Sequence, residues 1–190
     1  MPKSDVSAPI GTFPFDLRDV VFAAVSAAAI QLIGFLTIPL VLHIPVPGIR
    51  NIVSAPFSAM VLTLAAARIQ KRCTVLLVMG LCSVVYALIS PVIPAFVMTA
   101  AVVAELVNLS VFRGYASRRA RMTTITVFYT AMTPIATLWG AWILGGEYRD
   151  LISRPTFMAG AALLVCLLSL AGAWVGERIA AELRRAGKMP

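Results

Sequence analysis

One acidic residue, Glu105, lies well inside a long apolar stretch of the sequence. An ionised carboxylate at the centre of a membrane-spanning helix costs about 2.5–3.5 kcal/mol, so Glu105 should face protein and have a polar partner. Asn108 follows one helical turn later. Two interpretations are open for Glu105: a structural hydrogen bond or pairing with a loop arginine, which we favour, and a role in gating or in coupling to a partner protein.

Polar residues that flank the apolar segments could bind a small ligand. Arg50 and Asn51 follow a Pro-Gly turn, where an arginine could pair with an anionic ligand or extend to lipid headgroups. Glu147 and Asp150 lie in a polar loop. That loop could close over a ligand as a lid, or it could be a solvated loop whose ion pairs contribute little.

Four aromatic residues are expected at a similar depth on the same side, namely Tyr86, Phe96, Trp139 and Trp142. They could line an apolar ligand cavity, or they could form the aromatic belt at the membrane interface, which suits Trp142 best. Together with the four polar residues they complete the predicted ligand-binding set.

Side chains that could bind a metal or act as nucleophiles are few and scattered. His43 is the only histidine, and Cys73, Cys82 and Cys166 form no CxxC or CxxxH pattern. A zinc site or disulfide framework needs such clustering. We therefore predict no metal, no cofactor and no catalytic residue, with an axial bond from His43 to a tetrapyrrole metal as the alternative.

Six apolar segments must position these residues. Of 190 residues 60% are hydrophobic and 13% are charged, and the mean hydropathy is +0.92. Continuous apolar runs predict helices, because a barrel strand would alternate apolar and polar residues. We predict an all-α integral membrane protein, a single transmembrane domain over residues 1–190, with no signal peptide and with six spans at about 19–41, 51–67, 73–90, 95–111, 123–144 and 156–180.

Thirteen of the sixteen Lys and Arg residues are predicted on the side of the membrane that holds both ends of the chain. Basic loops stay in the cytoplasm, so both termini should be cytoplasmic. The net charge of +8 then reports orientation, and the bilayer, rather than nucleic acid, is the expected partner.

Small residues recur four apart on the predicted helices, which is typical of close helix packing in membranes. They form the pairs Ala23/Ala27 and Ala24/Ala28 in the first segment, Ala136/Gly140 in the fifth and Gly172/Gly176 in the sixth. Such pairs can pack inside the monomer. Alternatively, the alanine face of the first helix could dock a partner protein.

The chain resembles the substrate-binding (S) components of energy-coupling factor (ECF) importers, and in particular the MptD/Trep-Strep group. The likeness begins with the amphipathic start Phe15–Phe22 and the alanine-rich first segment that follows it. In Ala66–Gly80 a basic loop leads into a third segment that contains a glycine. In Val103–Arg119 an acidic residue precedes an Arg-Gly-Tyr sequence and a basic loop.

The resemblance implies a non-enzymatic subunit in the plasma membrane of a prokaryote. Such a subunit captures a vitamin or other micronutrient on its outer face and delivers it inward with a T component and two cytoplasmic ABC ATPases. It also implies that Ala23, Ala24, Ala27 and Ala28 dock the T component. The absence of a GxxxxGK[ST] loop from this sequence agrees with ATP chemistry in the partners. The alternatives are an integral membrane enzyme and a ligand-free membrane scaffold or assembly protein.

Overall fold

The computed structural model describes residues 15–41, 49–143, 145–146, 149, 152 and 154–187. Over these residues the fold is all-helical, and the six predicted segments are confirmed as helices. They are α1 (Leu17–Val41), α2 (Ile49–Ile69), α3 (Thr74–Ala87), α4 (Val92–Val111), α5 (Arg118–Ile143) and α7 (Pro155–Arg185).

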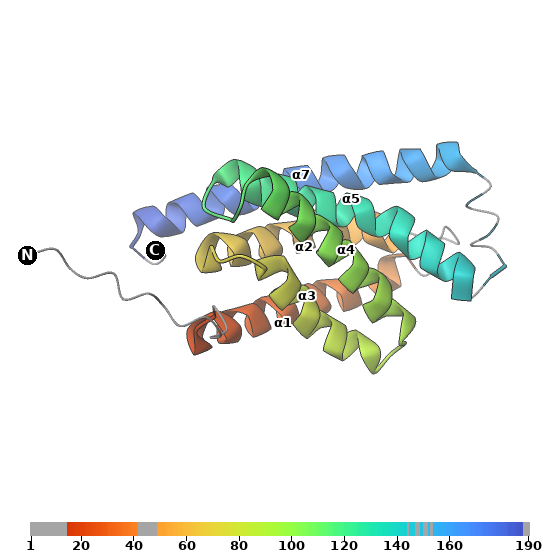
Figure 1. Ribbon diagram of the computed structural model, residues 1–190, viewed down its shortest axis with the longest axis horizontal. Coiled ribbons are helices and arrows are strands. Elements are labelled where there is room, and N and C mark those ends of the chain that lie inside the picture. Colours follow the sequence, from red (N-terminus) through yellow and green to blue (C-terminus); the bar gives the residue numbers. More distant parts are fainter. Residues whose placement is uncertain are drawn as a thin grey trace, which may run out of the picture.

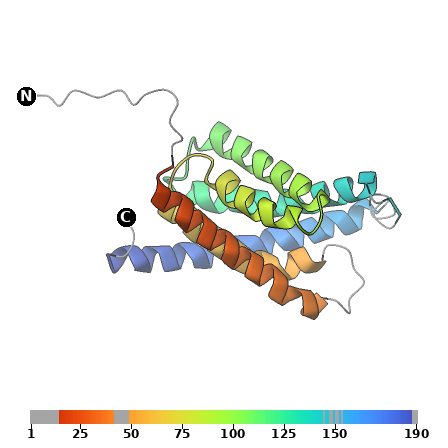
Figure 2. The same ribbon diagram turned by 90° about the horizontal axis from the view of Figure 1, so that it is seen from below.

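Successive helices run in opposite directions, so the start of α1 and the end of α7 lie at the same end of the bundle (Figure 1). Helix α2 is central and packs against α1, α3, α5 and α7. Figure 2 shows α1 crossing the bundle obliquely to α7. The core is built largely from small side chains such as Ala55, Ala59 and Ala66, which are fully buried. Small residues in the core allow the helix backbones to approach closely.

Four helices are long and apolar enough to cross a membrane: Leu17–Pro39, Asn51–Ile69, Val92–Val111 and Pro155–Arg185. Large apolar side chains on their outer faces, such as Leu32, Leu106 and Leu163, are exposed. Exposed apolar surface of this extent fits a lipid environment. The chain is therefore a membrane-embedded helical protein.

The other two helices do not reach the length or the hydropathy of these four membrane-span candidates, each for a different reason. Helix α3 is apolar but has only 14 residues. Helix α5 has 26 residues, of which six are threonine, and threonine lowers its mean hydropathy. Because Thr124, Thr126 and Thr133 are buried, the polar character of α5 faces the inside of the bundle.

Several helix boundaries differ from the sequence-based prediction: α3 ends at Ala87 rather than at about 90, α7 continues to Arg185 rather than to about 180, and α4 and α5 both begin earlier than expected. We expected Arg118–Arg121 in a loop, but α5 already begins at Arg118, because the Ser117 hydroxyl accepts a hydrogen bond from the Ala120 N–H (3.1 Å) and caps the helix. Helix α4 begins at Val92 and contains Pro94 in its first turn, where a missing N–H costs little.

Helix α7 lies directly on α2 at Gly172 and Gly176. A Cβ at Gly172 would lie 2.0 Å from the Pro56 carbonyl oxygen, and one at Gly176 would lie 2.8 Å from that of Met60. Only glycine permits this contact. Packing inside the monomer is therefore confirmed for this pair of small residues.

Candidate functional site

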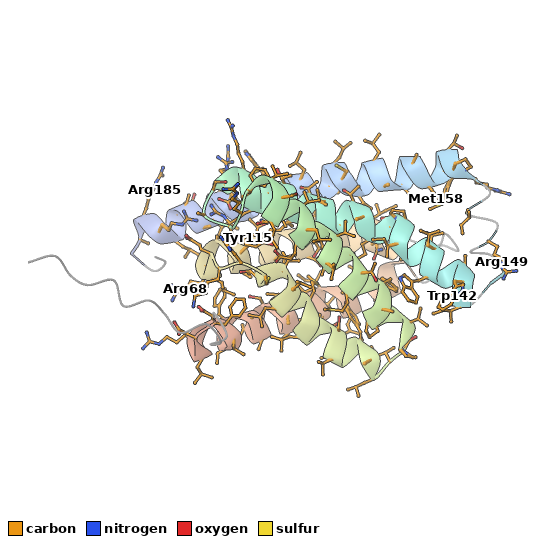
Figure 3. All side chains as sticks on the ribbon, in the orientation of Figure 1. Arg68, Tyr115, Trp142, Arg149, Met158 and Arg185 are labelled. Carbon is orange, nitrogen blue, oxygen red and sulfur yellow. The ribbon has the colours of Figure 1, made fainter. Side chains whose placement is uncertain are left out.

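The two ends of the bundle differ in charge. Figure 3 shows Arg68, Tyr115 and Arg185 at one end and Trp142, Arg149 and Met158 at the other. The first end, which we call the basic end, also holds the loops that join α2 to α3 and α4 to α5. The second, which we call the open end, holds the starts of α2, α4 and α7.

A cavity of about 420 Å³ extends into the bundle from the open end. All six helices of the described chain contribute to its wall. Ligand pockets for small molecules typically measure about 300–1,000 Å³ and are mostly apolar with a few polar groups. The lining fits that description: its polar members are Asn51, Ser54, Ser58, Tyr86, Ser90, Tyr129, Thr133 and Thr137.

Helix α5 supplies the longest stripe of the cavity wall. Its lining residues are Tyr129, Met132, Thr133, Ala136, Thr137 and Gly140. Successive spacings of three, one, three, one and three place them on one helical face. The small-residue pair Ala136/Gly140 thus lines the cavity. This mixed polar and small stripe is a sequence signal that could have located the site.

Two hydroxyls in the cavity wall, those of Thr133 and Tyr129, are buried and have no hydrogen-bond partner in the described part of the chain. Thr133 is 8% exposed, and its Oγ1 has no hydrogen-bond partner in the described part of the chain. Elsewhere, Thr99 and Thr137 donate to the carbonyl four residues earlier, at 2.7 and 3.0 Å. A buried hydroxyl without a partner costs about 1–3 kcal/mol. Thr133 is therefore placed to bond a bound molecule.

Three of the eight predicted ligand residues line this cavity: Asn51, Tyr86 and Phe96. The two tryptophans do not. Their rings contact each other edge to face with centroids 5.6 Å apart, and Trp142 is 77% exposed. Trp139 lies about 100° around the helix from Gly140 and just beyond Met132, at the edge of the cavity face of α5 and outside the lining residues. Depth along the helix was a poor guide without the correct face.

The remaining predictions lie partly outside the described residues. Arg50 lies in the first turn of α2, but its side chain is not described. His43, Glu147 and Asp150 are outside the described residues altogether.

The predicted docking face of α1 is divided between two environments. Ala23 and Ala27 are buried inside the bundle, and Cys82 Sγ lies 3.7 Å from the Ala27 carbonyl oxygen. Ala24 and Ala28 are exposed. Of the four alanines, only the second pair is accessible to a partner in this conformation.

Glu105 is held by hydrogen bonds at the basic end. Its Oε1 accepts from the Val75 N–H at 3.0 Å and from the Tyr115 hydroxyl at 2.8 Å. Helix α3 has no side-chain cap of its own, so Glu105 of α4 caps it, and the partial positive charge of the helix N-terminus favours a carboxylate there. Burial raises the pKa of Tyr115, which keeps its hydroxyl a donor. The geometry agrees with the structural role that we favoured.

A second buried acid, Glu177, was missed in the sequence. Its carboxylate pairs with Arg121, whose Nε donates to Oε1 and whose Nη2 donates to Oε2 at 2.9 Å. Arg121 Nη1 also donates to the Tyr115 and Ala116 carbonyls at 2.8 and 2.9 Å. Our interpretation of Glu105 as the one acid well inside a span was therefore wrong. Arg121 had been counted only as part of a basic loop.

Two further contacts connect the loops at the basic end. Lys71 Nζ lies 2.7 Å from the Asp19 carboxylate at the start of α1. Arg72 Nε donates to the Arg113 carbonyl at 3.3 Å. Polar contacts thus hold the α2–α3 loop against the start of α1 and against the α4–α5 loop.

The structure offers no candidate metal site within its described residues. They contain no group of three or more His, Cys, Asp and Glu side chains that could hold a metal ion. The three cysteines are free thiols.

Comparisons with known proteins returned nothing similar: no family model matches the chain, and neither curated proteins nor solved structures contain a match.

Proposed function

We propose that this chain is the substrate-binding subunit of an energy-coupling factor importer in the plasma membrane of a prokaryote. The observation that carries the proposal is the cavity of about 420 Å³ at the open end, whose wall draws on every described helix. A cavity assembled from all the helices of a bundle is suited to enclosing a solute, and its shape can change when the helices move.

The charge difference between the two ends supports a direction for this function. Arg68, Lys71 and Arg185 lie at the end opposite the cavity. Basic residues are retained in the cytoplasm, so the cavity would face outward and both chain ends inward. A solute such as a vitamin would enter at the open end, while a T component and two ABC ATPases would act from the membrane and the cytoplasm.

The exposed alanine pair of α1 supports a docking surface for the T component. Ala24 and Ala28 are both exposed on α1, with the larger Val21 and Val25 exposed nearby. Small residues allow a second membrane helix to approach closely.

Co-expression tests the proposal directly. We expect the tagged chain to retain a T-type membrane protein and a pair of ABC ATPases from the same genome through purification. Ala28→Trp should abolish this association. Ala171→Trp is the matched control, because Ala171 is exposed on α7, and this variant should assemble normally. If the wild-type chain retains no such partners, the importer assignment is wrong and a ligand-free scaffold becomes the better explanation.

Orientation has its own test. Reporters fused after residue 187 should be active only in the cytoplasm, as expected if α7 ends inside the cell. A periplasmic or extracellular C-terminus would place the cavity on the cytoplasmic side and would contradict import from outside.

A further inference from the structure

We infer that the cavity takes an uncharged molecule that carries a flat ring and a hydrogen-bonding group. This inference rests on the proposed function, because it treats the cavity at the open end as the substrate site. It goes further by assigning the charge and the shape of the substrate.

The absence of charge among the described lining residues argues for an uncharged ligand. That wall contains hydroxyls and one amide but no Asp, Glu, Lys, Arg or His. Transferring an ionised group into such a site without a counter-charge is far more costly than transferring a neutral polar group. Where this protein does bury charge, at Arg121 and Glu177, it supplies a two-point partner.

The aromatic lining argues for a flat ring. Tyr86, Phe96, Tyr129 and Phe157 come from four different helices, α3, α4, α5 and α7, and all reach the cavity. Aromatic side chains pair with flat rings in offset or edge-to-face arrangements that contribute about 0.5–1.5 kcal/mol each beyond the area they bury. Aromatic rings that converge from several helices would hold a planar molecule.

Thr133 supplies the polar contact. Its hydroxyl is buried, lines the cavity and is without a partner in the described part of the chain. Tyr129 lies one helical turn away on the same face, and its buried hydroxyl is likewise without a partner in the described part of the chain. A ligand group that donates to or accepts from Thr133 would remove the free-energy cost of the unpaired hydroxyl. This hydrogen bond would strengthen binding and fix the orientation of the ring.

Matched pairs of probes that differ in charge test the inference. Nicotinamide and nicotinate form one pair, and thymidine and thymidine 5′-monophosphate form another. Thermal unfolding of the detergent-solubilised full chain reports binding, since a ligand that binds only the folded state raises the midpoint. We expect the uncharged member of at least one pair to raise the midpoint in a saturable manner, and the anionic members to have no effect.

Thr133→Val then tests the polar contact. Without probe this variant should be as stable as the wild type or slightly more stable, because it removes an unpaired buried hydroxyl. With the stabilising probe, its affinity should be roughly two- to tenfold weaker, the usual effect of one lost hydrogen bond. Thr99→Val is the matched control: Thr99 is absent from the cavity wall and bonds its own helix, so probe affinity should not change.

Three results would overturn the inference: stabilisation by the anionic members only, no stabilisation by any probe at millimolar concentration, or wild-type affinity in Thr133→Val. None of these results alone removes the importer assignment, because retention of the T component and ATPases is measured without ligand. Loss of that retention with normal binding of uncharged probes would instead refute the importer and leave the substrate class standing.

Discussion

The Arg121 guanidinium on α5 and the Glu177 carboxylate on α7 form a two-point ion pair in the interior of the bundle. Their exposed fractions are 2% and 5%, and the sequence separates them by 56 residues. The same guanidinium also donates hydrogen bonds to two loop carbonyls, those of Tyr115 and Ala116. The Arg121 side chain thus connects α5, α7 and the loop before α5.

Breaking this pair should be strongly destabilising. Glu177→Ala leaves a buried, uncompensated guanidinium, and we expect a loss of about 3–5 kcal/mol. Thermal unfolding in detergent measures the loss. Arg119→Ala is the control, since Arg119 is exposed two residues away and should change stability by no more than about 0.5 kcal/mol. Equal effects of the two variants would show that the pair is not a major contributor.

Hydrogen bonding, rather than charge, should account for the role of Glu105. Glu105→Gln keeps an acceptor oxygen for the Val75 N–H and the Tyr115 hydroxyl, so it should retain most of the stability. Glu105→Ala leaves both donors buried and unpaired and should cost about 1–3 kcal/mol for each. Tyr115→Phe should lose about 1 kcal/mol. If Gln and Ala prove equally harmful in unfolding experiments, the negative charge itself is required and the gating alternative gains support.

Because α7 packs closely on α2, alanine substitutions at two glycines of α7 should change stability by very different amounts. Gly172→Ala places a Cβ against the Pro56 backbone, so we expect a loss of about 1–3 kcal/mol, with reduced yield of folded protein. At Gly160 an added Cβ meets nothing within 4 Å, and Gly160→Ala should be neutral or stabilise by up to about 1 kcal/mol. The two variants can be compared by their size-exclusion profiles and their thermal unfolding midpoints. Similar behaviour of both variants would mean that the helices separate easily here.

The contact between Lys71 and Asp19 predicts a loss of stability in alkali. A hydrogen bond to Asp19 raises the pKa of Lys71 above its ordinary value of 10.5. A raised lysine pKa contributes stability that is fully present below the ordinary value and is lost as pH rises through the folded-state value. Wild type should therefore lose more stability than Lys71→Met above about pH 10.

Lys71→Arg serves as the control for that pH effect. Arginine keeps its charge throughout this range, so this variant should show a flatter alkaline profile than wild type. Stability profiles of the three proteins that superimpose would refute the assigned contact. Added salt should also reduce the contribution of this half-buried pair.

Much of the fold follows from the order of apolar and basic residues. The six helices lie within a few residues of the predicted segments, because long apolar runs and prolines restrict where helices can begin and end. The boundary at Arg118 was wrong because one serine hydroxyl, that of Ser117, decides where α5 starts. Pattern alone does not reveal which polar side chain caps a helix.

The site was harder to predict than the fold. Asn51, Tyr86 and Phe96 do line the cavity, because position along the helix and residue type were enough to place them at this end of the bundle. Trp139 was misplaced because its helical face depends on how α5 packs against α4 and α7. Arg121 and Glu177 were missed because their pairing depends on contact between distant helices, which local sequence does not encode.

The cap that Glu105 places on α3 bears on how the protein is made. With 14 residues, α3 is about 21 Å long, shorter than the roughly 30 Å hydrocarbon core of a bilayer. Its Val75 N–H is satisfied by a carboxylate that is synthesised 30 residues later. Without α4, that amide would be one of the N–H groups that the start of a helix leaves without a partner. We therefore expect α3 to become stable in the membrane as half of a hairpin with α4, after α4 has been synthesised.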